Sequence, residues 1–370
     1  MDIEATLSRL EAEGNTRRLP HDCSGSAVLD LSGNDYLGIA GREDLRRSFM
    51  DEAADRGYAM TAAASRLLAS HQSEFEAFER TLADAYGRPA LLFNSGYHAN
   101  TGMISALSSD KRTLIVADRL VHASIIDGVR LGGAPMERFR HNDYNHLRRI
   151  LEKKGREYPS VLIIAESIYS MDGDRADIDA LVDAKRSLPG AMLYIDEAHA
   201  VGACGPHGLG LVEAAGRGAD VDIVVGTLGK ALAGTGAYGI MSERCKQFMV
   251  NKARSLIFST AMPPICAAWN RFVFGHMMQM DAERAHLAAL SRELYSILRL
   301  SSEPSHIAPF IAGNPRRAVE LSRHLERHGF HVLPIRTPTV PPGTDRLRFS
   351  ISAAMTAESL APLRTLLANA

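Results

Sequence analysis

The sequence predicts an α/β protein with a mostly parallel sheet that is covered by helices on both faces, followed by a smaller α+β domain. Helical and strand patterns alternate from about residue 73 onward, which is the order of βαβ units. Apolar, β-branched runs at 192–196 and 222–226 are typical of buried strands. The chain has 370 residues and is longer than a single hydrophobic core usually grows, so two domains are the default expectation.

The expected elements of the sheet follow in chain order. A short amphipathic helix over 2–13 carries Ile3, Leu7 and Leu10 at helical spacing, and a turn cluster occupies 33–38. The alternating region then predicts helix 74–86, strand 90–93, a helix from Gly96, strand 113–117, a helix from Ser124, strand 135–139, helix 144–154, strand 160–165, strand 192–196, strand 222–226, strand 237–241 and helix 243–252.

The character of the sequence changes after Pro263-Pro264, where two prolines in succession mark a break. Long helical patterns follow over roughly 265–300. Beyond them the sequence predicts strand 306–311, helix 315–328, strand 331–335, strand 346–351 and helix 356–368. We therefore expect an N-terminal segment (1–40), a large domain (41–264) and a small C-terminal domain (265–370).

The overall composition excludes several classes of protein. An apolar content of 46% and a charged content of 23% are ordinary for a globular enzyme, and a net charge of -1 does not favour nucleic acid or an anionic membrane as a partner. The four cysteines form no Cys-x-x-Cys pair, so we expect reduced thiols and no metal site. The N-terminus lacks the apolar core of a signal peptide, and no apolar run could span a bilayer. These observations predict a soluble cytoplasmic protein.

A lysine and an aspartate end two of the buried strands. Lys230 ends the run 224–230, and Asp196 ends the run 193–196. A lysine can bind pyridoxal 5'-phosphate (PLP) as a Schiff base, and an aspartate can pair with the protonated pyridine nitrogen so that the ring withdraws electrons. The two residues therefore predict a PLP site at the ends of these strands.

Two other motifs match known patterns by letter but not by context. Residues 196–199 spell the DEAH string of nucleic-acid-dependent ATPases, which also need a phosphate loop. Val224 and Ala231 stand where that loop would require its first glycine and its hydroxyl residue. Residues 234–239 match the dinucleotide fingerprint, but that fingerprint opens a helix, whereas we expect a strand here. We therefore reject both interpretations.

Gly96 and Tyr97 lie in a segment that follows strand 90–93 and starts a helix. Glycine lets the backbone approach a ligand closely, and the free amides at a helix N-terminus bind phosphate. Such a segment is by itself more often a plain strand-to-helix turn. Because the same sequence also carries Lys230 and Asp196, the segment with Gly96 and Tyr97 predicts a phosphate site.

Three further residues each have a functional and a plain structural interpretation. His122 could stack on a cofactor ring or be a surface residue at a helix entry, and we favour stacking. His199 could donate to the phenolic oxygen of the cofactor or simply start a helix. Arg348, in the alternating run 346–348, could hold a substrate carboxylate bidentately or face solvent.

A series of motifs resembles the α-oxoamine synthase family of fold-type I PLP enzymes over nearly the whole chain. The motifs lie at 32–38, 122–124, 170–174, 196–199, 227–230, 259–264 and 335–348. The resemblance implies the aspartate aminotransferase-like fold. Within the family, the block 335–348 and the segments 171–174 and 236–238 most resemble the 8-amino-7-oxononanoate synthases, while 5-aminolaevulinate synthases share much of the C-terminal block.

The resemblance implies roles for the site residues. Lys230 would be the Schiff-base lysine and general base, Asp196 the partner of the pyridine nitrogen, and His122 the residue stacked on the ring. His199 and Ser170 would contact the phenolic side, Gly96, Tyr97 and Thr227 would hold the phosphate, and Thr260 would reach the phosphate of a partner subunit. Asn34 and Arg348 would hold the amino-acid carboxylate, and Thr339, Arg17 and Arg18 are further candidates for substrate binding.

The activity implied by the resemblance is the decarboxylative condensation of L-alanine with a pimeloyl thioester in biotin biosynthesis. The products would be 8-amino-7-oxononanoate, CO2 and a free thiol, made by a homodimer, with coenzyme A or an acyl-carrier protein as the acyl carrier. The near alternative is another family member that uses a different amino acid and acyl-CoA, such as a glycine C-acetyltransferase, a 5-aminolaevulinate synthase or a serine palmitoyltransferase-like enzyme. The distant alternative is a non-enzymatic scaffold on the same fold.

The chain departs from the family pattern in two places. The family usually has a glycine-rich stretch before its Ser-Arg pair, where this chain has three alanines at 62–64. The family then commonly has a glycine and a histidine where this chain has Ser70 and Phe75. Both departures lie near the expected acyl and subunit-contact region, and they leave the PLP residues unchanged.

Overall fold

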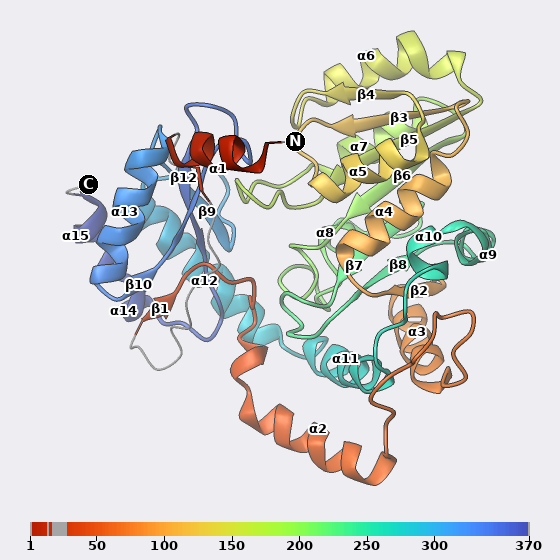
Figure 1. Cartoon of the computed structure of the whole chain (residues 1–370), viewed down its shortest axis with the longest axis horizontal. Helices are drawn as coiled ribbons and strands as arrows, with labels where there is room; N and C mark the ends of the chain where they lie inside the picture. Colours follow the sequence, from red (N-terminus) through yellow and green to blue (C-terminus); the bar gives the residue numbers. More distant parts are fainter. Residues whose placement is uncertain (1, 13–14, 17–27, 369–370) are drawn as a thin grey trace. The chain divides into compact units, whose positions relative to one another are not determined.

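The structure is a computed structural model that describes residues 2–12, 15–16 and 28–368, and it divides into two compact units (Figure 1). The larger unit comprises 37–169 and 175–284, and the smaller unit comprises the residues up to Tyr36, 170–174 and 285–370. The larger unit continues beyond Pro264, where we expected the large domain to end. It does so because α11 (Pro264–Met277) packs against α3 (Ser73–Tyr86) and α2 (Glu43–Arg56).

The larger unit is built on a seven-stranded sheet with the order β2-β8-β7-β6-β5-β3-β4. Strand β8 is antiparallel to both of its neighbours, and the other pairs are parallel, so the prediction of a mostly parallel sheet is confirmed. The strands are β2 (Ala90–Phe93), β3 (Thr113–Asp118), β4 (Met136–Phe139), β5 (Ser160–Glu166), β6 (Ala191–Asp196), β7 (Ile223–Thr227) and β8 (Ala237–Ile240).

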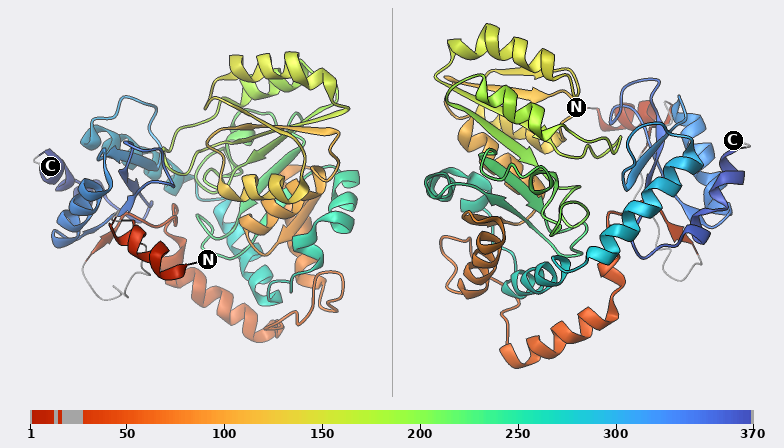
Figure 2. Two further views of the ribbon diagram at one scale, coloured as in Figure 1. Left: turned by 45° about the horizontal axis from the view of Figure 1, so that its top comes forward. Right: turned by 180° about the vertical axis from the view of Figure 1, so that it is seen from behind.

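Helices cover both faces of this sheet, with α4 (Gly96–Leu107) and α5 (Ala123–Gly132) on one face and α7 (Ile178–Arg186) on the other (Figures 1 and 2). Nearly every residue of β3, β5, β6 and β7 is therefore buried, which explains why these strands are apolar throughout. The unit also contains α6 (Tyr144–Lys154), α8 (Leu211–Ala214), α9 (Glu243–Lys252) and α10 (Arg254–Ile257), with 3-10 turns at Ile39–Gly41 and Gly155–Glu157.

The smaller unit contains an antiparallel sheet with the order β11-β12-β9 and a two-stranded parallel pair, β1 with β10. The C-terminal helix expected over 356–368 is divided in two, because Pro362 cannot continue the hydrogen bonding of α14. Its elements are α1 (Ile3–Ala12), β1 (Leu29–Asp30), α12 (Asp281–Leu298, which begins in the larger unit), β9 (Ile307–Ile311), α13 (Pro315–Arg327), β10 (Phe330–His331), β11 (Leu333–Ile335), β12 (Arg346–Ser350), α14 (Ala357–Leu360) and α15 (Leu363–Ala368). Among the described residues, no helix combines the length and the apolar character needed to cross a membrane.

Four parallel strands of the larger unit end in polar residues at the same edge of the sheet. Strand β3 ends in Asp118, β5 in Glu166, β6 in Asp196 and β7 in Thr227. In open α/β sheets, ligands bind outside the carboxyl ends of the strands. The fold therefore places the candidate site at this edge.

Ala63, in the stretch where the resembling family has glycines, has a positive φ of 50°. A side chain in this left-handed conformation costs about 1–2 kcal/mol, which glycine avoids. We expect Ala63→Gly to raise the free energy of unfolding by about 0.5–1 kcal/mol, after allowing for the greater freedom of glycine in the unfolded chain. Chemical denaturation measures the change. Ala64→Gly is the matched control and should destabilise the protein, because Ala64 does not have a positive φ; equal effects of the two substitutions would contradict the assignment of strain to Ala63.

Candidate active site

A cavity of about 310 Å³ opens at the carboxyl edge of the larger unit's sheet. The structure brings together seven of the predicted site residues in its wall: Lys230, Asp196, His199, His122, Gly96, Tyr97 and Thr227. They come from the ends of three strands, β3, β6 and β7, and from the start of α4, and are therefore widely separated in sequence.

Lys230 lies in the turn that joins β7 to the antiparallel β8. The turn is closed by backbone hydrogen bonds from Leu228 N to Gly236 O (2.9 Å) and from Gly234 N to Leu228 O (2.8 Å). These bonds present the lysine to the cavity, where its Nζ lies 2.8 Å from Nε2 of His199. An amine and an imidazole at this distance share one hydrogen, so a proton can move between the two groups.

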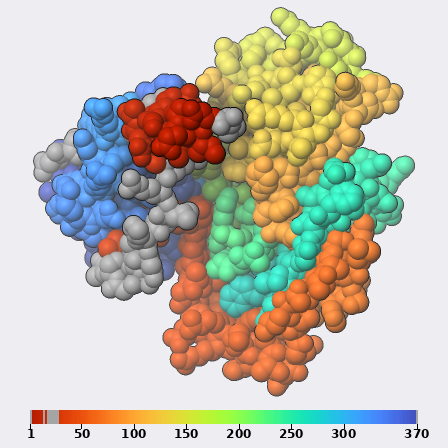
Figure 3. All heavy atoms as spheres, in the orientation of Figure 1, coloured from red at the N-terminus to blue at the C-terminus, as the bar shows by residue number. Residues whose placement is uncertain are grey.

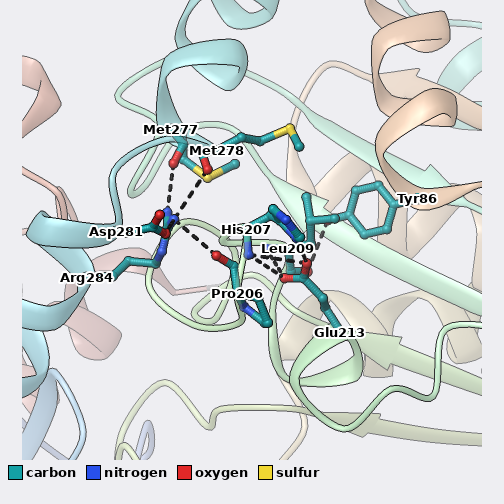
Figure 4. Close-up of polar contacts among 9 residues, drawn as sticks. All are labelled: Tyr86, Pro206, His207, Leu209, Glu213, Met277, Met278, Asp281 and Arg284. Atoms are coloured by element: carbon teal, nitrogen blue, oxygen red, sulfur yellow. Dashed lines mark hydrogen bonds and ion pairs between the residues drawn. The ribbon is translucent and has the colours of Figure 1, made fainter.

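The glycine-rich loop that follows His199 is held from several sides (Figure 4). The Glu213 carboxylate accepts from the backbone N–H of His207 and of Leu209 (3.0 Å for Leu209), and Tyr86 donates to the carbonyl of Leu209 (3.1 Å). The buried Arg284 donates to the carbonyls of Met277 (2.7 Å) and Pro206 (3.4 Å). These contacts fix the loop, and with it the position of His199 at the loop's start.

Asp196 is anchored by two donors. Its Oδ1 accepts from the backbone N–H of Ala198 (2.9 Å), and its Oδ2 accepts from Nδ2 of Asn100 (2.8 Å). Asn100 is itself oriented by the hydroxyl of Tyr194, which donates to its Oδ1 (2.6 Å). Donors of this kind stabilise an ionised carboxylate, so the site presents a fixed negative charge at this position.

The ring of His122 is held in one tautomer. Its Nδ1 accepts from the backbone N–H of Ser124 (3.2 Å) and lies 2.7 Å from Oγ of the same serine. Because a backbone N–H can only donate, Nδ1 carries no proton and Nε2 carries the hydrogen of the neutral ring. Burial lowers the pKa of His122, which further favours the neutral ring. A neutral, fixed imidazole in the cavity wall suits stacking on an aromatic ring.

Gly96 opens α4 where the helix N-terminus meets β7. Ser95 caps the helix by accepting from the backbone N–H of His98 (3.1 Å), and the first two residues of the helix, Gly96 and Tyr97, line the cavity. A Cβ at position 96 would lie 2.7 Å from Cγ2 of Thr227, so only glycine fits against that side chain. The helix start and the threonine form a cradle suited to an anion.

Four of the predicted residues that the structure describes belong to the smaller unit: Asn34, Ser170, Thr339 and Arg348. Arg348 is buried, and donates from Nη2 to Oδ1 of Asn34 (3.0 Å) and from Nε to the carbonyl of Ser170 (2.6 Å). The alternative in which Arg348 simply faces solvent is wrong, because strand β12 is buried along its whole length.

Thr339 lies in the loop after β11 and lines a separate cavity of about 830 Å³.

The remaining predicted residues do not line the cavity or cannot be described. Thr260 forms an isolated antiparallel β-bridge with Ser65. The two chain segments that contain these residues lie side by side on the surface of the larger unit (Figure 3). Thr260 is not in the wall of the cavity of its own chain. Arg17 and Arg18 lie outside the described residues.

Phe75, one of the departures from the family pattern, packs against an ionic cluster around the buried Glu79. The guanidinium of Arg66 stacks over its ring at 4.4 Å from the centroid and donates to Oε1 of Glu79 (2.9 Å). Lys246 also contacts that glutamate, at 3.1 Å. A phenylalanine at position 75 thus provides an aromatic face for a half-buried arginine, a contact worth about 1–2 kcal/mol.

Sequence reasoning assigned no role to Asn100, Ser124 and Glu166, which also line the cavity. Glu166 could have been found, because it follows an apolar strand as Asp196 does. Asn100 stands one helical turn after Gly96, and its link to Asp196 depends on a long-range contact. Only the folded chain shows that link.

Glu197, next to Asp196, predicts a pH dependence of stability. Burial raises its pKa to about 7, although Ser167 and the backbone N–H groups of Val212 (2.7 Å) and Leu211 (3.1 Å) donate to it. The folded state therefore binds this proton more tightly than the unfolded chain does. The resulting stability is fully present below about pH 4.5 and is lost as the pH rises to about 7, by up to about 3 kcal/mol.

Glu197→Gln is expected to remove this pH dependence of the free energy of unfolding, because a glutamine side chain does not titrate. Urea unfolding of both proteins at pH values from 5 to 8 measures it, because other titrating groups are common to both and cancel in the difference. Parallel stability curves for the wild type and the variant would contradict the raised pKa of Glu197.

The sequence matches a family model described as aminotransferase class I and II over residues 26–366. The chain belongs to this family. A Pasteurella multocida protein provisionally named 8-amino-7-oxononanoate synthase is 47% identical, and the match covers 94% of each chain. This relative supports the resemblance to the α-oxoamine synthases that the motifs indicated.

Two solved structures show the same fold. Serine palmitoyltransferase from S. paucimobilis, solved with PLP and myriocin bound, is 28% identical with a TM-score of 0.89, and the match covers 98% of this chain and 94% of that one. The 8-amino-7-oxononanoate synthase from Francisella tularensis is 26% identical with a TM-score of 0.78 over 94% of this chain and 98% of that one. The chain is therefore an α-oxoamine synthase with the fold-type I architecture, and an enzyme of the acyltransferase type, as predicted.

Proposed function

We propose that the protein condenses L-alanine with a pimeloyl thioester, with loss of CO2, to give 8-amino-7-oxononanoate and a free thiol in biotin biosynthesis. The observation that carries the proposal is the convergence of Lys230, His199 and Asp196 in one cavity. The choice among α-oxoamine synthases is supported by the relative that shares 47% of its residues.

The wall of the cavity fits PLP as the cofactor. Asp196 offers a fixed anion for a ring nitrogen, the neutral ring of His122 offers a face, and the cradle at Gly96 suits a phosphate. Lys230 supplies the amine that would hold the cofactor covalently. When bound, PLP supplies an electron sink for the bonds at the amino acid's Cα.

The chain's own residues would then handle protons and orientation. The Nζ of Lys230 would take the proton from Cα of alanine, and His199, 2.8 Å away, would tune the protonation of that amine. Asp196 would keep a proton on the ring nitrogen, because its carboxylate is held ionised by Asn100 and Ala198.

The carboxylate of alanine would be held by Arg348 and Asn34 of the smaller unit. Arg348 is buried and already oriented by Asn34 and by the carbonyl of Ser170, so that little side-chain entropy would be lost on binding. A guanidinium can bind a carboxylate through two parallel hydrogen bonds. Such a clamp would fix which bond at Cα stands perpendicular to the cofactor ring, and so would select the bond that breaks.

We also propose that the active enzyme is a homodimer in which Thr260 completes the phosphate site of the partner subunit. Exposed apolar side chains close to Thr260, at Phe258, Leu67 and Leu68, support a protein contact on this surface. Mixing Lys230→Ala with Thr260→Ala protomers should restore some activity, because one of the two sites in a mixed dimer carries neither lesion. No recovery after proven subunit exchange would contradict the shared site.

Thiol release from pimeloyl-CoA tests the proposed reaction. Alanine should support release, while glycine and serine should be poor co-substrates. Palmitoyl-CoA with serine is the matched comparison, because a serine palmitoyltransferase is among the similar structures. Release only with serine and a long-chain thioester would overturn the assignment in favour of that activity.

A further inference from the structure

Glu166 is a buried carboxyl group in the cavity wall for which the proposed mechanism has no use. It ends β5, is 3% exposed, and lies in register with Asp196 on the neighbouring parallel strand. Among the described residues, the donor that the structure gives it is the backbone N–H of His122. The side chain thus contacts the backbone of the residue expected to stack on the ring, and it belongs to the strand next to the one that ends in the ring's partner.

Two buried carboxyl groups at adjacent strand ends cannot both ionise cheaply. Asp196 receives two hydrogen bonds, from Asn100 and Ala198, whereas Glu166 receives one. Asp196, which accepts more hydrogen bonds, therefore keeps the negative charge, and Glu166 keeps a proton. Burial, and then the Asp196 carboxylate, raise the pKa of Glu166 well above its usual value.

The other charged groups near Glu166 do not reverse this order. Lys230 and the backbone of His122 lower the pKa of Glu166, while Asp118, at the end of β3, raises it. Asp118 is fully buried and receives hydrogen bonds from the backbone N–H of Leu120 (2.8 Å) and of Asn142 (2.9 Å), so its carboxylate is held by its own donors. Glu166 is therefore the member of this cluster with the least support for a negative charge.

We propose that Glu166 is held as a neutral acid that positions His122 and leaves Asp196 as the single anion of the adjoining pair. One carboxylate then matches one positive charge on a cofactor ring. The protonation state follows from the chain's own residues. Its use in holding PLP rests on the proposed function.

Infrared spectroscopy of the purified protein tests the protonation state without any assay of activity. At a pH well above the value of about 7 for Glu197, the wild type should show the carbonyl stretch of a buried protonated carboxyl group. Glu166→Gln should lose this band, whereas Glu197→Gln, the matched control just after the end of β6, should keep it. The band should titrate at lower pH in Asp196→Asn, because that substitution removes a charge that favours the proton on Glu166.

Binding of PLP then tests the positioning role. Glu166→Gln mimics the neutral acid and should bind PLP within about threefold of the wild type, with the same pH dependence, whereas Glu166→Ala should lose at least about tenfold in affinity as His122 loses its backbone partner. A wild type without the band, or Glu166→Gln that loses as much affinity as Glu166→Ala, would overturn the proposal. Neither readout involves the acyl or amino-acid substrate, so a different reaction would leave both results intact.

Discussion

Replacing Lys230 with alanine is expected to abolish turnover, because the substitution removes both the amine that would bind PLP and the base that would move the Cα proton. The lysine occupies a turn closed by backbone hydrogen bonds and faces His199 at 2.8 Å, so no neighbouring side chain can take over its position. Loss of a covalent nucleophile and a base together typically costs many orders of magnitude in rate. Steady-state thiol release with alanine measures the effect.

Borohydride reduction followed by peptide mapping locates the residue directly. The reduced cofactor should be found on the peptide that contains Lys230. Lys252→Ala is the matched control, because Lys252 ends α9 and lines a different cavity of the larger unit. A label on Lys252 or any other lysine would show that the covalent partner has been misassigned.

The sheet could be predicted because local sequence determines it. Strands such as β3 and β6 are buried on both faces and are therefore apolar throughout, which makes them visible without any tertiary information. Helix α2 (Glu43–Arg56) was missed for the opposite reason. It buries only Leu45 and Phe49 along 14 residues, so its apolar periodicity is weak, although Gly57 with a φ of 62° marks its end.

The assignment of chain segments to the two units could not be predicted, because it depends on pairing between segments that are distant in sequence. Strand β1 pairs with β10 from the other end of the chain, and residues 170–174 belong to the smaller unit although both of their flanks belong to the larger one. Gly173 shows how close that association is, since a Cβ there would lie 2.0 Å from the carbonyl oxygen of Ile307. Local periodicity carries no information about such contacts.

Within the site, residue type and strand position predicted the chemistry but not the supporting contacts. Lys230 and Asp196 are recognisable because charged residues rarely end apolar strands without a reason. Arg346 and Arg348 look equivalent in sequence, and both are buried. Only the fold shows that Arg346 pairs with Asp172, while Arg348 contacts Asn34.

Asp196→Asn is expected to leave PLP binding measurable and to lower kcat/KM by about 200- to 5,000-fold, which corresponds to roughly 3–5 kcal/mol for loss of a buried charge partner. A neutral amide cannot hold a proton on the ring nitrogen. Its NH2 group would also face Nδ2 of Asn100 or the backbone N–H of Ala198, both of which donate to the present carboxylate. Binding titrations and steady-state rates separate the two effects.

Asp222→Asn provides the matched control for this prediction. Asp222 precedes β7 at the opposite edge of the same sheet, where it accepts from the backbone N–H of Leu193 (2.7 Å) and pairs with Lys185 (2.6 Å). Its substitution removes a carboxylate that, like Asp196, has two polar partners, but at the edge of the sheet opposite the cavity. Asp222→Asn should therefore lower the free energy of unfolding while kcat/KM stays within about threefold of the wild type. If Asp196→Asn lowered kcat/KM no more than this control, the loss would reflect general destabilisation and Asp196 would not be the partner of the ring nitrogen.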